Sequence, residues 1–400
     1  MTLDLLKVGP QVSEMARTNA ASFLQLGPRI LEAQAVLGRL APHWSELEEI
    51  AASAARRLPR PQEPLDVRHP AMPVPADHIV IATDGSQIEP DRHAMADFFL
   101  LNVGWAVVRY GREPFAELSS EPTLFYKPED TYITHGSRRV PIQDRHLSAR
   151  RSVLEITQAA TLATRWHEQV DDLAVLADGT LALWVLEERP DDFLRKALVA
   201  PYVEQLKRLR ALNRPLASYI SRPRSIEVSN LLQDGGCDGA LGGCTACAEG
   251  HEDQCVFERL PDRELFGWLG FGERSGLFQM TLPEGLVDFY EDLVPCFFYL
   301  NVGSEIARVE VPRYATIDAR VALGFELTVI AAVVVGGVAI RGGAGTVLGM
   351  ALGALTLLVI RNGLTLVRVD PLWLQGVYGL VILVAITIDA FVVRRTRRQR

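Results

Sequence analysis

The stretch HIVIATDGSQ, residues 78–87, decides the fold that we expect for this chain. It begins with an apolar run rich in β-branched residues, which is typical of a buried strand. It ends in Asp84-Gly85-Ser86, residue types at which a chain leaves a strand and turns. The sequence therefore predicts a buried strand that carries a carboxylate, Asp84, at its tip.

Two further strand candidates follow at 97–110 and 114–126, separated by Gly111. Together with the first strand they predict an antiparallel meander of three strands. A Pro-rich stretch, 59–75, precedes the meander and has the composition of a linker. Before it, from residue 12 to residue 57, apolar positions recur at helical spacing, which indicates a helical packing or dimer arm.

A long helical pattern comes next, from Asp144 as a candidate N-cap to about residue 170, and it carries Glu155. The apolar segment 173–184 then reads as a strand interrupted by Asp178-Gly179. Three strands, a helix and a fourth strand are the order of a ribonuclease H-like core, in which the first and fourth strands are neighbours. We expect Asp84 and Asp178 to approach each other, with Glu155 reaching them from the helix.

Three converging carboxylates cannot all be charged at low cost unless divalent cations neutralise them. Two metal ions about 4 Å apart would activate water and stabilise the leaving oxygen in phosphodiester hydrolysis. The alternative is that Asp-Gly at a strand end is ordinary turn chemistry. The order of Asp84, Glu155 and Asp178 along the expected core favours the metal site.

Seven stretches in sequence order resemble those of the NurA nucleases and together run along residues 78–313: ATDGSQ, RSVLEITQAATLA, LADGTLALW, PLASYISRPRS, LPDRELFGWL, GERSGLF and FYLNVGSEIARVEVP. The resemblance implies a ribonuclease H-like fold, manganese- or magnesium-dependent cleavage of DNA in end resection, a homodimer, and a hexameric HerA-like ATPase as partner. Carried over by position, Asp84, Glu155 and Asp178 match the metal-binding carboxylates of that family.

One feature of the family is missing. NurA nucleases continue past the position of Pro312 with a segment that brings a Tyr and a His to the active site, whereas no histidine follows His251 here. Loss of an acid/base group weakens catalysis by roughly 10²- to 10⁴-fold. An alternative function is therefore a non-catalytic module that binds DNA or an ATPase.

Four cysteines form the cluster Cys237-x6-Cys244-x2-Cys247-x7-Cys255, with several glycines around it. Such a set can supply four thiolates to a tetrahedral Zn²⁺, and glycines let a short loop close around the ion. Unligated thiols are one alternative, and an iron–sulfur cluster is another, although its known spacings are not matched. The fifth cysteine, Cys296, lies in an apolar run and is expected in the core.

The net charge of −8 argues against attraction of the whole surface to nucleic acid, so DNA must meet a local basic patch. Basic residues gather before and along the Glu155 helix, where Arg138, Arg139 and Arg145 are followed by Arg150 and Arg151. The predicted DNA-binding residues are Arg150, Arg151, Arg222 and Arg224. The alternative is a solvated charged face.

The C-terminal part is of a different character. Apolar stretches occupy 327–340, 346–360 and 376–393, of which only the third, about 18 residues long, matches the length of a full span. The terminal RRTRRQR indicates a cytoplasmic end. Two spans with a re-entrant segment would keep both ends on one side of the bilayer.

The segment from about residue 323 to residue 390 resembles the C-terminal end of ribose-type ABC sugar permeases, including a GG-x4-GG-x-G pattern. Only the tail of that family is present, and the permeases use about ten helices. The resemblance therefore implies a fusion, joined around residues 317–324. A fragmentary component of a sugar transporter is a further alternative function.

We expect an α/β protein with a ribonuclease H-like mixed sheet, flanking helices and an α-helical membrane segment. Residues 1–42 mix charges with apolar residues, which argues against a signal peptide. The expected localisation is the cell membrane, multi-pass, with the nuclease domain in the cytoplasm. The expected parts are an arm and linker at 1–75, a NurA-like domain at 76–320 with a Cys-rich insertion at 234–256, and a permease-like fragment, in contact with lipid, at 321–400.

Overall fold

The computed structural model describes residues 5–71, 74–90, 98–111, 113–184, 192–237, 241, 243–250 and 255–314. Among these residues no helix is both long and apolar enough to span a bilayer. The predicted membrane segment, 321–400, lies outside the described residues. The chain forms two compact units: the first contains the residues up to Pro70 with Tyr219–Val287 and Val294–Arg313, and the second contains Ala71–Ser218 with Asp288–Leu293.

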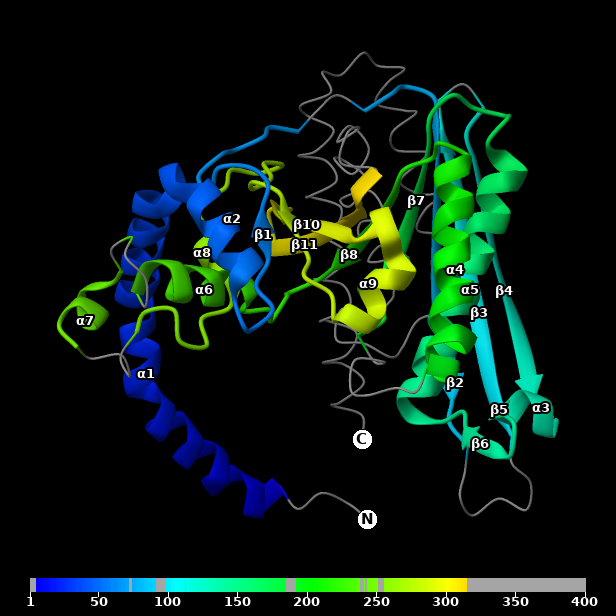
Figure 1. The fold of residues 1–400 in the computed structure, drawn as a ribbon, viewed down its shortest axis with the longest axis horizontal. Helices are drawn as coiled ribbons and strands as arrows, with labels where there is room; N and C mark the ends of the chain where they lie inside the picture. The colour runs from blue at the N-terminus through cyan, green and yellow to red at the C-terminus, as the bar shows by residue number, and fades with distance from the viewer. Residues whose placement is uncertain are drawn as a thin grey trace, which may run out of the picture. The chain divides into compact units, whose positions relative to one another are not determined.

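A meander of three long antiparallel strands forms one side of the second unit (Figure 1). The strands are β2 (His78–Ile88), β3 (Phe99–Tyr110) and β4 (Phe115–Phe125). β2 pairs on its other side, in parallel, with β7 (Leu173–Asp178). β8 (Leu216–Ile220), whose residues as far as Ser218 belong to this unit, lies next to β7. The predicted meander and the predicted neighbours, the first and fourth strands, are therefore confirmed, and the sheet is mixed.

Helix α4 (Asp144–Trp166) lies across this sheet, and α5 (Asp192–Ala211) packs beside it. The buried residues of α4, among them Leu147, Ile156 and Ala163, follow the three- and four-residue spacing of one helix face. The alanines on that face allow close approach to the strands. The fourth strand ends at Asp178, earlier than expected, because Gly179 turns the chain with φ +75°.

A short hairpin precedes α4 and was not predicted. After α3 (Pro128–Thr131), strands β5 (Tyr132–His135) and β6 (Arg138–Pro141) pair through a two-residue loop. Gly136 takes φ +60° at the first loop position, as in a type II′ turn. Ile133 packs against a buried cluster of Phe99, Leu101, Ile142 and Leu147, which fixes the base of the hairpin to the unit.

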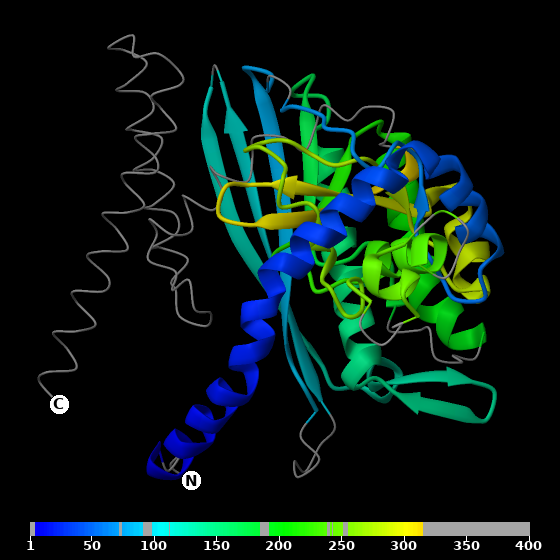
Figure 2. The same ribbon diagram turned by 90° about the vertical axis from the view of Figure 1, so that its left-hand side faces the viewer.

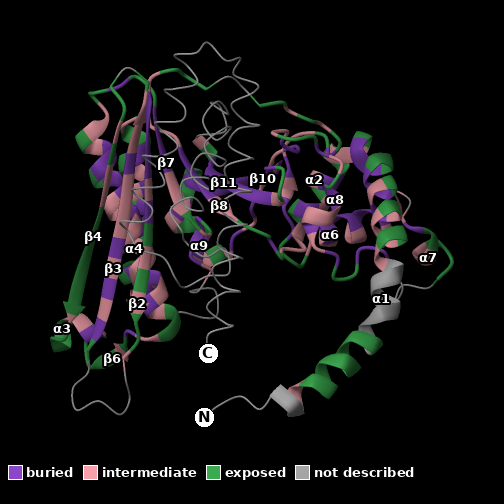
Figure 3. Cartoon of the chain, turned by 180° about the vertical axis from the view of Figure 1, so that it is seen from behind, coloured by how far each residue is buried: buried purple, intermediate pink, exposed green. Residues whose placement is uncertain are grey.

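The first unit combines a long helix with a small antiparallel sheet. The helices are α1 (Leu5–Leu40), α2 (Trp44–Ser53), α6 (Glu227–Leu232), α7 (Thr245–Ala248) and α8 (Asp262–Leu265), with α9 (Glu284–Tyr290) at the unit boundary. The strands run in the order β1 (Arg60–Pro61), β9 (Phe278–Gln279), β10 (Pro295–Asn301) and β11 (Ile306–Pro312). β10 and β11 are buried almost throughout, as the purple ribbon in Figure 3 shows.

A charged group lies inside this unit. Arg308 on β11 is 4% exposed and Glu310 is 1% exposed, and the Arg308 Nε lies 2.9 Å from Glu310 Oε1. The same guanidinium also pairs with Glu227 of α6 and lies over the ring of Phe297. A buried ion pair contributes little net stability, but removing one partner leaves an uncompensated charge. Arg308 is therefore necessary for the stability of this sheet.

We predict that Arg308→Met lowers the local free energy of unfolding of β10 and β11 by about 3–5 kcal/mol, because Glu310 then stays buried without its cation. Hydrogen exchange of the β10 and β11 amides, followed by mass spectrometry, measures this. The control is Arg222→Ala, an exposed arginine 3.7 Å from Glu305, for which we expect a change below about 1 kcal/mol. Equal exchange in both variants would contradict the prediction.

Candidate active site and thiol cluster

The two aspartates predicted to be metal ligands lie at matching positions of two adjacent strands. β7 ends at Asp178, whereas β2 continues past Asp84 to Ile88, so Asp84 does not lie at the tip of its strand as the sequence predicted. β2 and β7 pair in parallel with Thr83 beside Ala177, and the next residue in each strand is an aspartate, Asp84 or Asp178. Residues at matching positions of neighbouring strands direct their side chains to the same face of a sheet. Both aspartates are exposed, so an ion or a substrate can reach them.

Glu155 approaches the two aspartates from the fourth turn of α4. Its side chain is only 14% exposed. The approach is possible because residue 85 is a glycine: a Cβ at that position would lie 2.3 Å from Glu155 Oε1 and 2.8 Å from Arg151 Cγ. The alternative for Asp84-Gly85 was ordinary turn chemistry. The pair instead lies within a regular strand, β2, where the glycine leaves space for the Glu155 carboxylate.

The pKa values of Glu155 and Asp178 respond to burial and to neighbouring carboxylate charge. Desolvation raises the pKa of Glu155 to about 7; Arg151 opposes the shift, and the charges of Asp84 and Asp178 add to it. The pKa of Asp178 is also raised, first by desolvation and then by the charge of Asp84. The three carboxylates that the sequence singled out thus lie near enough to interact, but among the described residues their oxygen atoms are less tightly grouped than the four sulfurs of the thiol cluster described below. A divalent cation, which prefers hard oxygen ligands, suits this set of donors.

Two of the predicted DNA-binding arginines already have partners within the chain. The Arg151 Nε lies 3.0 Å from Glu155 Oε1, and its Nη1 donates to Gln87 Oε1 at 3.2 Å. Arg150 lies over the ring of Phe125 with its Cζ 4.9 Å from the centroid, and desolvation lowers its pKa. Sequence reasoning missed the role of Arg151 as a counter-ion, although its spacing of four residues from Glu155 is the signal for such a pair.

The other two predicted DNA-binding arginines belong to the first unit. Arg222 follows β8, has φ +44°, and is 80% exposed at the side chain. Its backbone N–H donates to Glu305 Oε2 at 3.0 Å, and its Nε lies 3.7 Å from the same atom. Arg224 is exposed.

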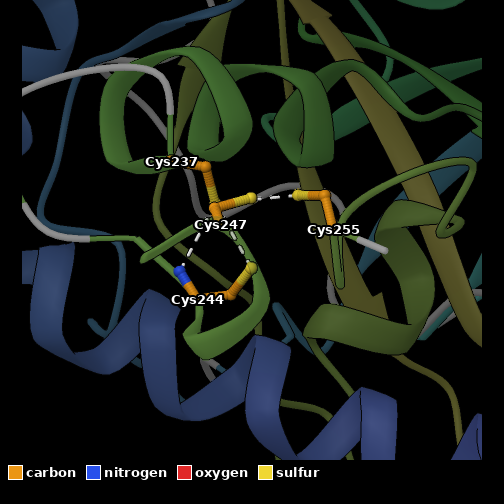
Figure 4. Close-up of side chains that lie close together, drawn as sticks. All are labelled: Cys237, Cys244, Cys247 and Cys255. Atoms are coloured by element: carbon orange, nitrogen blue, oxygen red, sulfur yellow. Dashed lines mark hydrogen bonds between the residues drawn. The ribbon is translucent and has the colours of Figure 1, made fainter. Parts of the chain in front are cut away.

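The four clustered cysteines gather around one point (Figure 4). Cys237 ends a π-helical turn (Gln233–Cys237), Cys244 and Cys247 flank the start of α7, and Cys255 follows in the chain. The Sγ atoms of Cys244 and Cys255 each lie 3.6 Å from that of Cys237, and all four sulfurs lie within 4.8 Å of one another. All are free thiols, since a disulfide would need about 2.05 Å.

These distances fit a tetrahedral ion. Four sulfurs at 2.3 Å from a central Zn²⁺ lie about 3.8 Å apart, close to what is found here. Desolvation opposes ionisation at Cys244, yet its pKa is lowered because backbone N–H groups of Val256 and Cys247 donate to the sulfur. Within the described part of the chain, this is the one group of three or more His, Cys, Asp or Glu side chains whose ligand atoms are so tightly grouped.

The thiol cluster also connects to α1. Arg39 donates to the carbonyl oxygen of Gly243 at 3.1 Å, and the backbone N–H of Thr245 donates to Glu32 at 2.9 Å. Arg29 donates to the carbonyl oxygen of Val256 at 2.8 Å. Close packing inside the loop leaves no space for a side chain at residue 243, where a Cβ would lie 2.5 Å from the Cys237 Cα. The Cys-rich insertion therefore packs on the C-terminal half of α1.

Comparison with curated proteins finds ABC permeases. The chain is 49% identical over 65 residues to a probable ABC transporter permease protein, y4mJ, of Sinorhizobium fredii, covering 16% of this chain and 20% of the relative. It is 40% identical to the ribose import permease protein RbsC of Escherichia coli, covering 32% of this chain and 50% of the relative. The chain thus spans at most about half the length of these relatives, and the expected fusion with a permease-like fragment is confirmed.

Comparison with family models and with solved structures finds NurA. The NurA nuclease from Sulfolobus solfataricus covers 76% of this chain and 80% of its own length, at 12% identity and a TM-score of 0.39. A structure of NurA with manganese covers 60% and 80%, at 11% identity and a TM-score of 0.28. The NurA domain profile matches residues 78–324, which is more than half of the chain. The matched range contains Asp84, Glu155 and Asp178, and because the profile covers more than half of the chain, the chain belongs to the NurA domain family of nucleases.

Proposed function

We propose that this protein is a divalent-metal-dependent deoxyribonuclease of the DNA end-processing type, with a membrane-embedded tail. One observation carries the proposal: Asp84, Asp178 and Glu155 come from two paired strands and a helix to one solvent-accessible place, where desolvation and the charge of Asp84 raise the pKa values of Glu155 and Asp178. A protein gains no stability from grouping like charges in this way. Such a cost is typical of a site that works with cations.

Asp84, Glu155 and Asp178 would hold Mn²⁺ or Mg²⁺, which when bound supplies charge neutralisation and an activated water for phosphodiester hydrolysis. Before loading, Arg151 provides part of the compensating charge through its ion pair with Glu155. Gly85 keeps open the space that the Glu155 carboxylate occupies. Glu155 must also release its proton as it becomes a ligand, because a protonated carboxyl group binds cations poorly.

The thiol cluster would hold a structural Zn²⁺ that ties the insertion to α1 through the contacts of Arg29, Glu32 and Arg39. We further propose that the protein acts on DNA as a homodimer, together with a HerA-like ATPase. Residues 321–400 would place it at the cell membrane with the nuclease on the cytoplasmic side, as the permease-like segment and the Arg-rich end suggest.

We predict that Asp84→Asn, Asp178→Asn and Glu155→Gln each reduce manganese-dependent cleavage of labelled DNA by at least about 10²-fold, because each removes a ligand charge. The assay uses the full chain in detergent, with single-stranded and duplex substrates. The matched control is Glu168→Gln, beyond the end of α4, where the carboxylate is 86% exposed, and it should retain full activity. A folded, metal-loaded chain that cleaves nothing would instead favour a non-catalytic binding module.

We predict that the affinity for Mn²⁺ increases with pH and levels off above about pH 7. Glu155 has a pKa raised to about 7, so below that pH the cation must displace a proton, and the affinity falls by up to about tenfold per pH unit. Electron paramagnetic resonance of free Mn²⁺ measures the affinity between pH 5.5 and 8.5. Glu155→Gln should bind more weakly and lose most of this slope. A slope that is unchanged in Glu155→Gln would assign the proton to another group.

We predict one Zn²⁺ per chain after purification without added metal, by mass spectrometry of the metal content. Cys244→Ser should lose it, because three thiolates and a hydroxyl group bind zinc far more weakly than four thiolates. The control is Cys296→Ser, since Cys296 lies on β10 outside the cluster and should leave the zinc content at one. A full complement of iron in place of zinc would contradict the assignment.

A further inference from the structure

We propose that the β5–β6 hairpin is a DNA contact in addition to the carboxylate site, at which Arg138 and Arg139 bind backbone phosphates before the DNA strand reaches the carboxylates. This inference rests on the proposed nuclease function but uses residues outside the carboxylate site. Figure 2 shows the hairpin as a pair of teal strands that stands away from α4. Arg138 and Arg139, in the first two positions of β6, are both exposed.

The pairing of the two strands determines which side chains share a face. Arg138 is the cross-strand partner of His135, and Arg139 is the partner of Thr134. Because side chains alternate along a strand, the two arginines lie on opposite faces of the hairpin at its tip. The tight two-residue turn at Gly136 holds this tip in one register. The hairpin thus presents a cation on each face.

Aromatic rings orient both guanidinium groups. The Arg139 Cζ lies 4.4 Å from the ring centroid of Tyr132, and the Arg138 Cζ lies 5.4 Å from that of Phe193 on α5. His135 stacks on the same Phe193 ring at 5.3 Å with an interplanar angle of 12°. A guanidinium that is supported by a ring still presents N–H donors at its edge, and it loses less rotamer freedom when it binds a phosphate.

The local charge favours a polyanion. Residues 132–143 contain two arginines and a histidine and no acidic residue, although the chain as a whole carries −8. The nearest carboxylates in sequence are Asp130 and Asp144, one on each side of this segment, and Asp191 and Asp192 directly precede Phe193, the ring that Arg138 contacts. Phosphate contacts of this kind supply most of the sequence-independent affinity for DNA.

Along the polypeptide, the hairpin directly precedes the helix that carries Glu155. β6 ends three residues before α4 begins, and Glu155 follows 11 residues into that helix, about 16 Å along its axis. Arg151 is closer to the carboxylates, but its guanidinium is paired with Glu155, whereas Arg138 and Arg139 are exposed and lie over aromatic rings. The hairpin arginines are therefore the better candidates for the first contact with DNA.

The test measures DNA binding without cleavage. Fluorescence anisotropy of labelled single-stranded and duplex DNA is recorded with the full chain in detergent, in EDTA, between 50 and 200 mM salt. For Arg138→Ala/Arg139→Ala we expect at least a tenfold loss of affinity at 50 mM salt. The slope of log affinity against log salt should decrease by about 1.8 on duplex DNA or about 1.4 on single strands, for two lost phosphate contacts. The DNA form that shows the decrease identifies the ligand.

Two control variants separate this role from a structural one. Arg165→Ala removes a similar arginine, which is 57% exposed and lies over the ring of Trp166. Because Arg165 is paired with Glu117, this variant should leave the slope unchanged. Arg138→Lys/Arg139→Lys keeps the charges and should restore most of the slope. An unchanged slope in the double alanine variant on both DNA forms would overturn the proposal, as would equal losses in Arg165→Ala.

Cleavage with Mn²⁺ is assayed separately, so the two proposals can fail independently. Hairpin-dependent binding by a chain that never cleaves DNA would contradict the nuclease function and support the hairpin contact. Normal cleavage with a salt slope that does not depend on the hairpin would support the nuclease function and contradict the hairpin contact. Retention of zinc and of Mn²⁺ binding in the alanine variant shows that the chain is folded.

Discussion

The parallel pairing of β2 with β7 is the constraint on which the candidate active site depends. A shift of one residue in this register would direct one aspartate to the other face of the sheet. With Thr83 beside Ala177, the two aspartates that follow lie side by side and direct their carboxylates to one face of the sheet. Helix α4 covers the same strands, and its alanine-rich face lets it approach closely enough for Glu155 to join them. The site is thus a consequence of how the sheet and the helix pack.

Grouping three acids has an electrostatic cost, and the chain compensates part of it internally. Arg151 pairs with Glu155 one helical turn away, and the raised pKa of Glu155 allows a proton to remove a further charge near neutral pH. Divalent cations can displace both the Arg151 guanidinium and the Glu155 proton, because they compete for the same carboxylate oxygens. The same pairing explains why an arginine next to the site is not automatically a ligand for phosphate.

The first unit solves a different problem. Its buried charges, Arg308 and Glu310, are compensated within the protein, and Asp262 accepts hydrogen bonds from two backbone N–H groups and from Tyr299. Even so, desolvation raises the pKa of Asp262 to about 6. The thiol cluster adds a second point of stabilisation, because its loop packs on α1 through hydrogen bonds that span more than 200 residues of sequence. A metal there would connect local loop geometry to the position of a long helix.

The sequence alone determined the order of the strands and the helix, the three carboxylates and the thiol cluster, since each depends on local patterns and short spacings. It also identified the NurA domain and the permease-like fragment. Only the tertiary structure decided the rest. The hairpin at 132–141 has no strong strand pattern and is held by Phe193 on a later helix. The fourth strand ends at Asp178 because the backbone turns at Gly179. The contacts of Arg150 with Phe125 and of Arg151 with Glu155 also depend on packing. Contacts between distant segments are set by burial and pairing, which no local pattern contains.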